Sequence, residues 1–282
     1  MTQFVPVLLN ALTLISILML VALGLAVIFG LMNIINLAHG EFVTIGAYTL
    51  ALTQAMGGNY WLALAVAPFV GAALGLTVEW TMVRHLYRRP LAVILATWGL
   101  GMVLQQGLQI IFGAAPQRVA GPLSGAVEIF GAPYPAYRLL LIGFAIAIVL
   151  ACYAGFRWTR FGLDLRAVIQ DRDMAAALGI DTGRVYSLAF ALGAAIAAVA
   201  GVLIAPLTVV IAQMGINYLA RSFFVVIVGG VGGIGGVAAG SAVVGGTESL
   251  LNYQVPVTVS QALVLVLAIV IVRFRPRGLV PL

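Results

Sequence analysis

Residues 157–184, RWTRFGLDLRAVIQDRDMAAALGIDTGR, are the most arginine-rich segment of the chain and lie between two long apolar runs. Five of the 14 basic residues are in this segment, and all 14 are arginine. Six more arginines form two further clusters, Arg84/Arg88/Arg89 and Arg273/Arg275/Arg277. Because positively charged short loops stay on the cytoplasmic side during membrane insertion, the three clusters predict three cytoplasmic segments and a cytoplasmic C-terminus.

The composition indicates a membrane protein and excludes other classes. Hydrophobic residues make up 63% of the chain, charged residues make up 8%, and the mean hydropathy is +1.16. A soluble globular domain, with about 25% charged residues, is therefore excluded. The net charge of +6 comes from arginines in loops that flank apolar runs, which indicates membrane topology and not nucleic-acid binding.

Several kinds of chemical site are also missing from the sequence. A P-loop ATPase needs a lysine to reach the phosphates, and the chain has none, so any ATP that drives transport must be hydrolysed by another polypeptide. A single cysteine, Cys152, and two scattered histidines offer no disulfide and no metal site. The lack of HExxH, GxSxG or paired intramembrane aspartates argues against an intramembrane enzyme with catalytic residues.

The apolar runs predict the fold class. A crossing helix needs roughly 20 apolar residues, and an even number of crossings must separate clusters that share one side. Two crossings fit between the first and second clusters, and the next interval is long enough for four tilted or broken spans. We expect an all-α polytopic membrane protein of about 8–10 transmembrane helices, with one transmembrane domain over residues 1–282. The expected spans are 5–31, 42–56, 61–83, 91–112, 139–156, 185–212, 223–244 and 257–272, with 236–251 as a candidate further short span.

Two broken or re-entrant segments interrupt this pattern and predict a solute path. They are residues 33–41, NIINLAHGE, and the glycine-rich residues 229–240. Irregular backbone at membrane depth is tolerated only beside protein or a water-filled cavity, and interrupted helices are the usual pointer to a transporter's substrate path. The candidate pathway residues are Asn33, Asn36, His39, Glu41, Gln105, Gln109, Gly232 and Gly233.

The same residues also have structural interpretations. Residues 33–41 can brace a broken helix, with His39 and Glu41 satisfying each other's hydrogen bonds. Gln105 and Gln109 share a helix face and can bond between helices. The glycines fit close helix packing or an unwound hinge.

Three charged residues outside the clusters have separate interpretations. Glu79 is expected to be an ordinary interfacial charge near Arg84 and His85. Arg221 is expected at the outer surface, and Glu248 fits either a pathway or the outer boundary.

Within the arginine-rich segment, the sequence predicts a short amphipathic helix on the cytoplasmic surface. Alanine, leucine and methionine favour helix, and Gly179 is a suitable helix stop. Asp171 and Asp173 lie near the start of this helix, where acidic groups interact favourably with the helix dipole.

Residues 173–179, DMAAALG, resemble the EAA-type motif of bacterial ABC-importer permeases, which forms the coupling helix that docks on the ATPase. Residues 24–48, GLAVIFGLMNIINLAHGEFVTIGAY, resemble the N-terminal signature of the branched-chain amino acid permease family. Residues 190–203 and 275–279 resemble later signatures of the same family. The matches run in the family's order over nearly the whole chain.

The resemblance implies a permease domain that moves solute by alternating access and binds no cofactor of its own. It implies four kinds of partner: the lipid bilayer of the bacterial inner membrane, a second permease that is usually a paralogue, two ATP-binding subunits that hold ATP and Mg, and a periplasmic solute-binding protein. The loop 157–184 would couple to the ATPase. The implied coupling residues are Arg166, Asp171, Asp173, Ala175, Ala176 and Gly179.

The solute has two interpretations. The family serves branched-chain and other hydrophobic amino acids, and one branch serves urea and short-chain amides. Residues 95–106 and 166–174 are similar to the urea and amide branch. Trp98 favours small amides as the solute by a narrow margin over amino acids. The alternative function is a stand-alone channel or ion-coupled carrier, which would have no use for a coupling loop.

Overall fold

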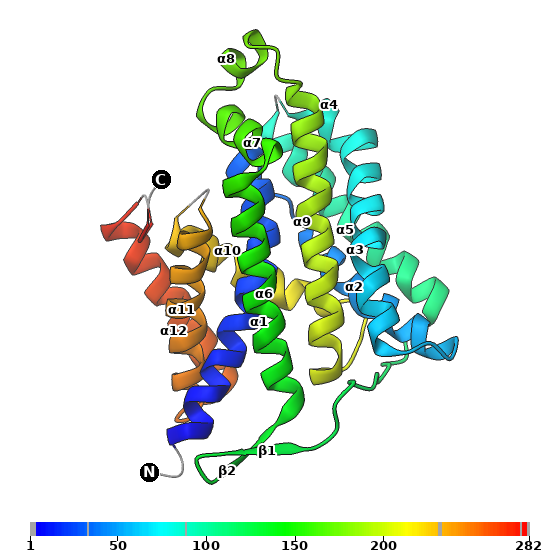
Figure 1. Ribbon diagram of the computed structural model, residues 1–282, viewed down its shortest axis with the longest axis vertical. Helices are drawn as coiled ribbons and strands as arrows, with labels where there is room; N and C mark the ends of the chain where they lie inside the picture. The colour runs from blue at the N-terminus through cyan, green and yellow to red at the C-terminus, as the bar shows by residue number, and fades with distance from the viewer. Residues whose placement is uncertain (1–3, 33, 88, 231–232, 277, 281–282) are drawn as a thin grey trace.

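The computed structural model describes residues 4–32, 34–87, 89–230, 233–276 and 278–280. Long helices run between two ends of the molecule, and a small β-hairpin closes one end (Figure 1). The order of elements is α1 (Phe4–Met32), α2 (His39–Ala55), α3 (Tyr60–Val78), η1 (Glu79–Val83), α4 (Arg84–Leu86), α5 (Pro90–Phe112), β1 (Ala126–Ile129), β2 (Ala132–Pro135), α6 (Ala136–Trp158), α7 (Arg160–Gln170), α8 (Arg172–Ala177), α9 (Thr182–Ile204), η2 (Ala205–Leu207), α10 (Met214–Gly229), α11 (Ile234–Leu251) and α12 (Val257–Phe274).

Seven helices of the described chain are long and apolar enough to cross a membrane. They are α1, α3 with its extension through α4, α5, α6, α9, α11 and α12. The all-α polytopic class is confirmed, while the count by length falls below the expected 8–10. The difference lies in α2, with 17 residues, and α10, with 16, both too short by this measure.

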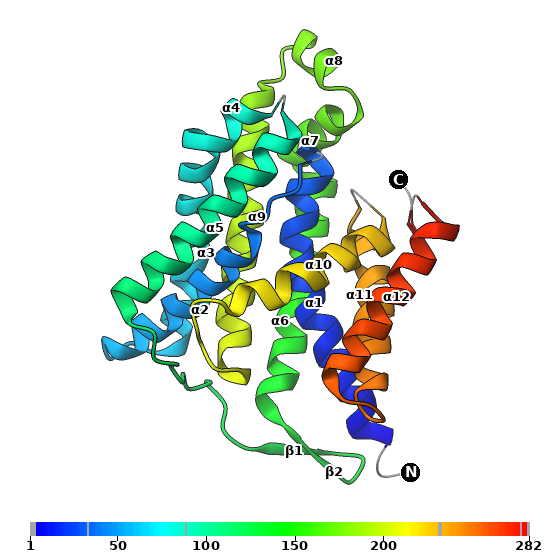
Figure 2. The same ribbon diagram turned by 180° about the vertical axis from the view of Figure 1, so that it is seen from behind.

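The limits of two expected spans are wrong. The span expected at 185–212 ends at Ile204, because α9 is followed by η2 and an irregular stretch. The span expected at 223–244 is two helices, since α10 ends at Gly229 and α11 begins at Ile234. The candidate short span at 236–251 is most of α11. Figure 2 shows that α10 crosses the middle of the molecule obliquely to the long helices.

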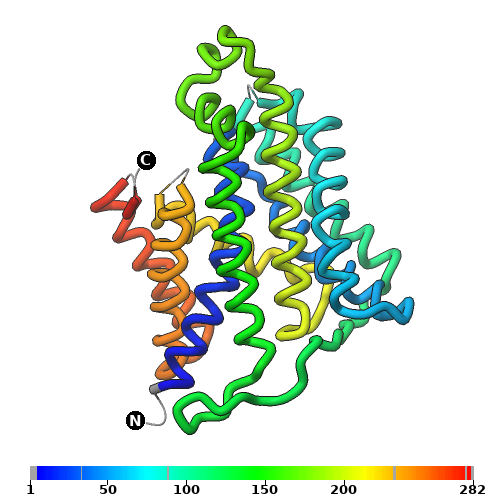
Figure 3. The backbone as a smooth tube through the Cα atoms, viewed as in Figure 1, coloured from blue at the N-terminus to red at the C-terminus, as the bar shows by residue number. Residues whose placement is uncertain are grey.

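The described arginines of the three clusters lie toward the same end of the molecule. Helices α4, α7 and α8 and the end of α12 are on this side, whereas the N-terminus and the hairpin are at the opposite end (Figures 1 and 3). Two helices, α5 and α6, separate the first cluster from the second. Four helices, α9 to α12, separate the second from the third. Both intervals thus hold an even number of helices, as predicted, when α10 is counted although it is too short to span by length.

Close backbone approach shapes the core around α9. This helix packs against α1, α2 and α3, and most of its residues are buried. A Cβ atom added at Gly201 would lie 1.9 Å from the carbonyl oxygen of Val43, so only glycine permits this approach of α9 to α2. The glycine-rich segment is similar, because a Cβ at Gly240 would lie 2.1 Å from the oxygen of Val225 on α10. Small residues allow such packing in membranes.

Candidate functional site

The first candidate site is the break between α1 and α2, which covers described residues 34–38. Asn36 organises the chain here: its Oδ1 accepts from the backbone N of Ala38 at 3.0 Å, and its backbone oxygen accepts from the N of His39 at 3.3 Å. Thr97 of α5 adds a tertiary bond, since its Oγ1 accepts from the N of Leu37 at 3.1 Å. Asn36 thus starts α2, and Thr97 holds the break against α5.

His39 and Glu41 are both buried at the start of α2, but they have different partners. His39 Nε2 lies 3.1 Å from the carbonyl oxygen of Val21. Glu41 Oε1 accepts from Nε2 of Gln105 at 2.7 Å. The prediction that His39 and Glu41 satisfy each other is therefore wrong. The structure instead joins Glu41 to Gln105, two predicted pathway residues that are distant in sequence.

One face of α5 makes the contacts of Thr97 with Leu37 and of Gln105 with Glu41. Thr97, Gly101 and Gln105 are spaced by four residues, which aligns them along a helix. A Cβ on Gly101 would lie 3.8 Å from Cγ of Glu41, an ordinary contact distance. Away from this face α5 is open, and Trp98 is 56% exposed. Thr97 was missed from the sequence because a lone threonine in an apolar run carries no signal.

Three buried polar atoms in the break have no hydrogen-bond partner in the described chain: Nδ2 of Asn36, Nδ1 of His39 and Oε2 of Glu41. A buried polar group without a partner costs about 1–3 kcal/mol, and more when it is charged. The site therefore holds two nitrogens and a carboxylate oxygen whose hydrogen-bonding capacity is unused.

The other predicted pathway residues lie elsewhere or outside the described chain. Gln109 is half-buried one turn beyond Gln105 on α5. Gly233 lines a cavity between α1, α6, α7 and α11, and none of residues 34–41 line this cavity. Asn33 and Gly232 fall outside the described residues.

The second candidate site is the surface formed by α7 and α8. Thr159 caps α7 by accepting from the N of Gly162 at 3.1 Å, and this helix buries Leu165 and Val168 while its other side is exposed. Arg166 turns back to α6, where its Nη1 donates to the carbonyl oxygen of Phe156 at 2.8 Å. The predicted short helix is α8, and a further helix that the sequence did not predict, α7, packs on the bundle before it.

Local caps determine both ends of α8. Asp171 Oδ1 accepts from the N of Met174 at 2.9 Å, an N-cap. At the other end, the N of Ile180 donates to the oxygen of Ala175 and the N of Gly179 donates to the oxygen of Ala176, both at 3.0 Å. This is a Schellman motif. It needs a residue with positive φ, and Gly179 has φ of +88°, so the predicted helix stop is confirmed.

The side chains of α8 divide into a buried and an exposed set. Ala175 is 2% exposed, so it packs against the protein and does not face outward. Met174 and Leu178 are 59% and 75% exposed, and Asp173 and Ala176 are exposed as well. The exposed side of α8 thus combines two apolar side chains with polar and small residues.

A chain of contacts links α8 to the buried end of α3. The Arg172 guanidinium lies 5.0 Å from the ring centre of Tyr186, and that ring lies 5.0 Å from the ring of Tyr87. Tyr87 donates to Oε1 of Glu79 at 2.5 Å, and Ser187 donates to Oε2 at 2.6 Å. Burial, together with the Glu79 carboxylate, raises the pKa of Tyr87 and keeps its hydroxyl a donor.

The expectation for Glu79 is therefore wrong. Its side chain is 1% exposed, lies in the π-helical turn η1, and accepts hydrogen bonds from two hydroxyls. The predicted neighbours Arg84 and His85 form no ion pair with it in the described residues. Sequence distance favoured the basic neighbours, whereas packing brings Ser187 from α9.

Arg221 also differs from its prediction. Its Nη1 lies 3.3 Å from Oε1 of Glu248, and the two side chains are 23% and 2% exposed. Gln261 donates to the same oxygen at 3.5 Å, so this cluster ties α10 to α11 and α12. Arg221 is not an outer surface charge, and the two alternatives for Glu248 are replaced by an ion pair inside the bundle.

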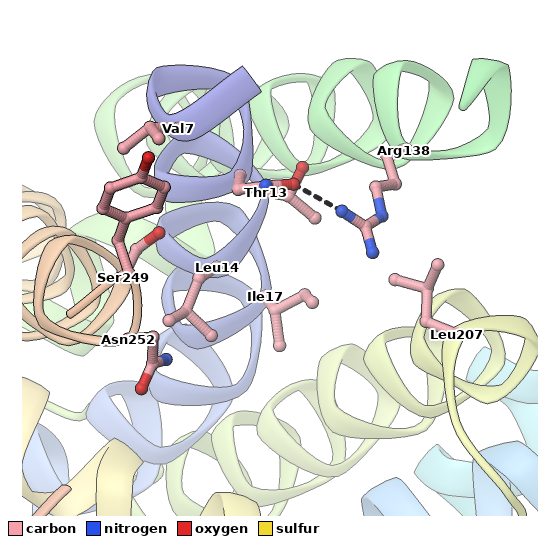
Figure 4. Close-up of a pocket in the computed structure, with 10 residues that line it drawn as sticks. Val7, Thr13, Leu14, Ile17, Arg138, Leu207, Ser249 and Asn252 are labelled. Carbon is pink, nitrogen blue, oxygen red and sulfur yellow. Dashed lines mark hydrogen bonds between the residues drawn. The ribbon is translucent and has the colours of Figure 1, made fainter. Parts of the chain in front are cut away.

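A third feature is a cavity of about 410 Å³ at the end of the molecule opposite the arginine clusters. Figure 4 shows its lining from the start of α1, the start of α6 and the end of α11. Arg138 is the charged residue of the lining and donates to Oδ1 of Asn10. The cavity is an open hollow at the hairpin end, lined by apolar side chains such as Leu14 and Ile17 together with a few polar ones.

Comparisons with known proteins agree with this architecture. Residues 7–272 match the family model described as the branched-chain amino acid transport system permease component. The chain is similar to the high-affinity branched-chain amino acid transport system permease protein LivH of Salmonella typhimurium, with 30% identity covering 98% of this chain and 95% of the relative. The probable permease LivH of Methanocaldococcus jannaschii is 26% identical over 84% of this chain and 78% of its own length.

A second type of relative is also similar. The permease protein LivM of Escherichia coli is 26% identical, covering 96% of this chain and 69% of the relative. No solved structure matches the chain. The similarity to LivH extends over nearly all of both chains, whereas LivM is longer than the region matched.

Proposed function

This chain belongs to the branched-chain amino acid transport permease family, and on that premise we propose that it is one permease subunit of an ATP-driven importer for branched-chain amino acids. It is a multi-pass membrane protein with a transport role. Beyond this family membership and transport role, the proposal assigns the energy source, the solute and the partner subunits.

The observation that carries the proposal is the exposed helix α8. Capped at both ends, it presents Met174 and Leu178 on the arginine-rich end and connects through Arg172 to Tyr186 of α9. A channel or ion-coupled carrier has no need for such a surface. An ATPase that binds α8 would move a helix that contacts the core helix α9 through Arg172 and Tyr186.

We propose that the break between α1 and α2 meets the solute during transport. Oε2 of Glu41 is a free acceptor and Nδ2 of Asn36 a free donor, which suits the ammonium and carboxylate groups of an amino acid. Trp98, which tilted the sequence interpretation toward urea, is 56% exposed on α5 and supports no contact with solute there. Amino acids are therefore proposed ahead of urea and short-chain amides.

The same proposal assigns orientation and partners. Residues 1–282 form one permease domain in the inner membrane, with the arginine clusters and the C-terminus in the cytoplasm. The partners are a second permease, two ATP-binding subunits that hold ATP and Mg, and a periplasmic binding protein. Similarity to both LivH and LivM supports a paralogue as the second permease.

The test is uptake into proteoliposomes that contain the chain with its co-purifying subunits. Labelled leucine and labelled urea are supplied in parallel, with and without ATP on the α8 side. ATP-dependent leucine uptake is expected. Urea uptake alone would replace the proposed solute, and uptake of either solute without ATP would indicate a channel or carrier.

A matched pair of variants tests the docking surface. Ala176→Glu places a charge on exposed α8 and is expected to separate ATP hydrolysis from transport. Ala126→Glu makes the same change in the exposed hairpin at the other end and should leave the coupling intact. Equal coupling in both variants would remove α8 from the ATPase interface.

A further inference from the structure

The largest cavity described above has no role in the proposed transport cycle. Its volume is about 830 Å³, and it lies between α1, the end of α6, α7 and the start of α11. Its α1 wall runs from Leu23 to Leu31, a distance of about 12 Å along the helix axis at 1.5 Å per residue. The cavity is thus elongated along α1, parallel to the bundle.

The lining is apolar except at one edge. Side chains of α1, Phe156, Leu165 and Ile169 provide most of the surface, and Gly235 leaves the α11 side open because a Cβ there would meet only Val280 at 3.8 Å. The polar edge has Arg157, Arg166 and Gln170, and no acidic residue is in the lining. The cavity therefore favours a molecule with a long apolar part and an anionic end.

The two guanidinium groups are available for such an end. In the stretches that the structure covers, neither Arg157 nor Arg166 forms an ion pair with a carboxylate. Arg166 is oriented by its bond to the oxygen of Phe156, which uses only one of its N–H groups. A guanidinium has five donors in a planar fork that matches phosphate.

The surroundings of the polar edge are those of a membrane interface. Tyr153 and Trp158 flank Arg157 and are 52% and 79% exposed, and such aromatics collect at the headgroup level. Leu163 of the amphipathic helix α7 is 60% exposed, as in a helix that lies along the bilayer surface. The polar edge is thus at headgroup depth and the apolar part at acyl-chain depth.

We propose that this cavity binds an anionic phospholipid, with its phosphate on Arg157 and Arg166 and an acyl chain along Leu23–Leu31. Basic pockets between transmembrane helices hold anionic headgroups in the same way. An amino acid has no part long enough to use the α1 wall, which favours the lipid. Assignment to the cytoplasmic leaflet rests on the proposed orientation, whereas the lipid site does not depend on the transported solute or on ATP.

The test measures retained lipid directly. The complex with its co-purifying subunits is reconstituted in phosphatidylglycerol and phosphatidylcholine, extracted and washed in detergent, and the bound lipids are counted by native mass spectrometry. The wild type should retain phosphatidylglycerol in preference to phosphatidylcholine. At about fivefold per arginine, the double variant Arg157→Gln/Arg166→Gln should weaken this retention about 30-fold.

Two variants separate the cavity from general charge. Arg160→Gln removes an arginine of the same segment that is absent from the lining and should retain the lipid. Gly235→Phe fills the cavity, keeps both arginines and should lose the lipid. Gel filtration and subunit co-purification identify a variant that fails to fold. If either the double variant or Gly235→Phe fails, lipid retention in the other one tests the proposal.

Three results would overturn the proposal. They are unchanged retention in the double variant, full retention in the filled variant, and displacement of phosphatidylglycerol by excess leucine, which would make the cavity part of the solute path. Leucine uptake is measured on the same preparations. Loss of uptake with normal lipid retention contradicts the importer and leaves the lipid site standing.

Discussion

The α1–α2 break and helix α8 both interrupt apolar sequence with polar residues, but they are stabilised in opposite ways. In α8 the caps come from residues three to five positions away, such as Asp171 with Met174 and Ile180 with Ala175. In the break, the bonds from Leu37 to Thr97 and from Gln105 to Glu41 span 60 and 64 residues. Polar sequence facing water supplies its own partners, whereas polar sequence inside the bundle depends on neighbouring helices.

The two regions also differ in what remains unpaired. The break retains three buried atoms without a partner, and α8 has its backbone ends capped while apolar side chains project outward. The break thus keeps unused hydrogen-bonding groups inside the bundle, whereas α8 keeps apolar side chains at the surface. Four substitutions test this contrast, from the largest expected effect to the smallest.

Gln105→Leu should have the largest effect, because it removes the hydrogen bond that the structure gives the buried Glu41 carboxylate. We expect the free energy of unfolding to fall by about 3 kcal/mol, together with loss of leucine uptake. Thermal unfolding in detergent and uptake in proteoliposomes measure the two effects. Gln109→Leu, one turn further along α5, is the control and should cost much less. Equal losses in the two variants would mean that the hydrogen bond from Gln105 to Glu41 contributes no particular stability or transport activity.

Tyr87→Phe comes next, since it breaks the link between α8 and η1. Glu79 keeps its bond from Ser187, so the expected loss is smaller, about 2 kcal/mol. Uptake should decline more than ATP hydrolysis, because the path of contacts from Tyr186 through Tyr87 to Glu79 is interrupted. The control is Tyr153→Phe, whose parent side chain is 52% exposed on α6. If both variants keep wild-type stability, the hydroxyl bond to Glu79 does not stabilise this end of the bundle.

Gly179→Ala should affect α8 alone. An L-residue at φ of +88° costs about 1 kcal/mol. This cost increases the population of the locally opened state of α8 without changing the free energy of global unfolding. Hydrogen exchange of the Ala177 to Ile180 amides should accelerate about fivefold. Gly155→Ala is matched, because a Cβ there meets nothing within 4 Å, and it should change nothing. A large fall in global stability with Gly179→Ala would contradict the local origin of the cap.

Asp171→Ala should have the smallest effect. Loss of an exposed N-cap costs about 0.5–1 kcal/mol, confined to the first turn of α8. The Met174 amide donates its hydrogen to the Asp171 side chain, so the hydrogen-exchange rate of this amide measures the loss of the cap directly. In Asp164→Ala the same residue type is removed from α7, where it is not a cap, so exchange at Met174 should stay at the wild-type rate. Identical exchange in both variants would show that the cap is not formed in solution.

Several sequence expectations failed for one reason, the choice of partner across helices. Glu79 was assigned to Arg84 and His85, and it bonds to Tyr87 and Ser187. Arg221 was assigned to the outer surface, and it pairs with Glu248. His39 and Glu41 were paired with each other, and each found a partner on another element. Nearness in sequence suggested the neighbours of Glu79, His39 and Glu41, and distance from the clusters suggested the place of Arg221, whereas helix packing decides the partners of all four.

The sequence alone determined the features that depend on local hydrophobicity and local hydrogen bonds. These are the membrane class, the shared side of the described arginines of the clusters, a helix break within each of residues 33–41 and 229–240, and the stop of α8 at Gly179. Insertion depends on the length and charge of each segment, and a cap depends on its own few residues.

Only the tertiary structure decided which polar groups meet and where space remains. It placed Thr97 and Gln105 against the break, ended α10 at Gly229, and left a mostly apolar cavity beside Arg157 and Arg166. Inside a bilayer no water satisfies a polar side chain, so its partner depends on which helix packs beside it. Packing of one helix face against another involves residues far apart in the chain, and no short pattern specifies it.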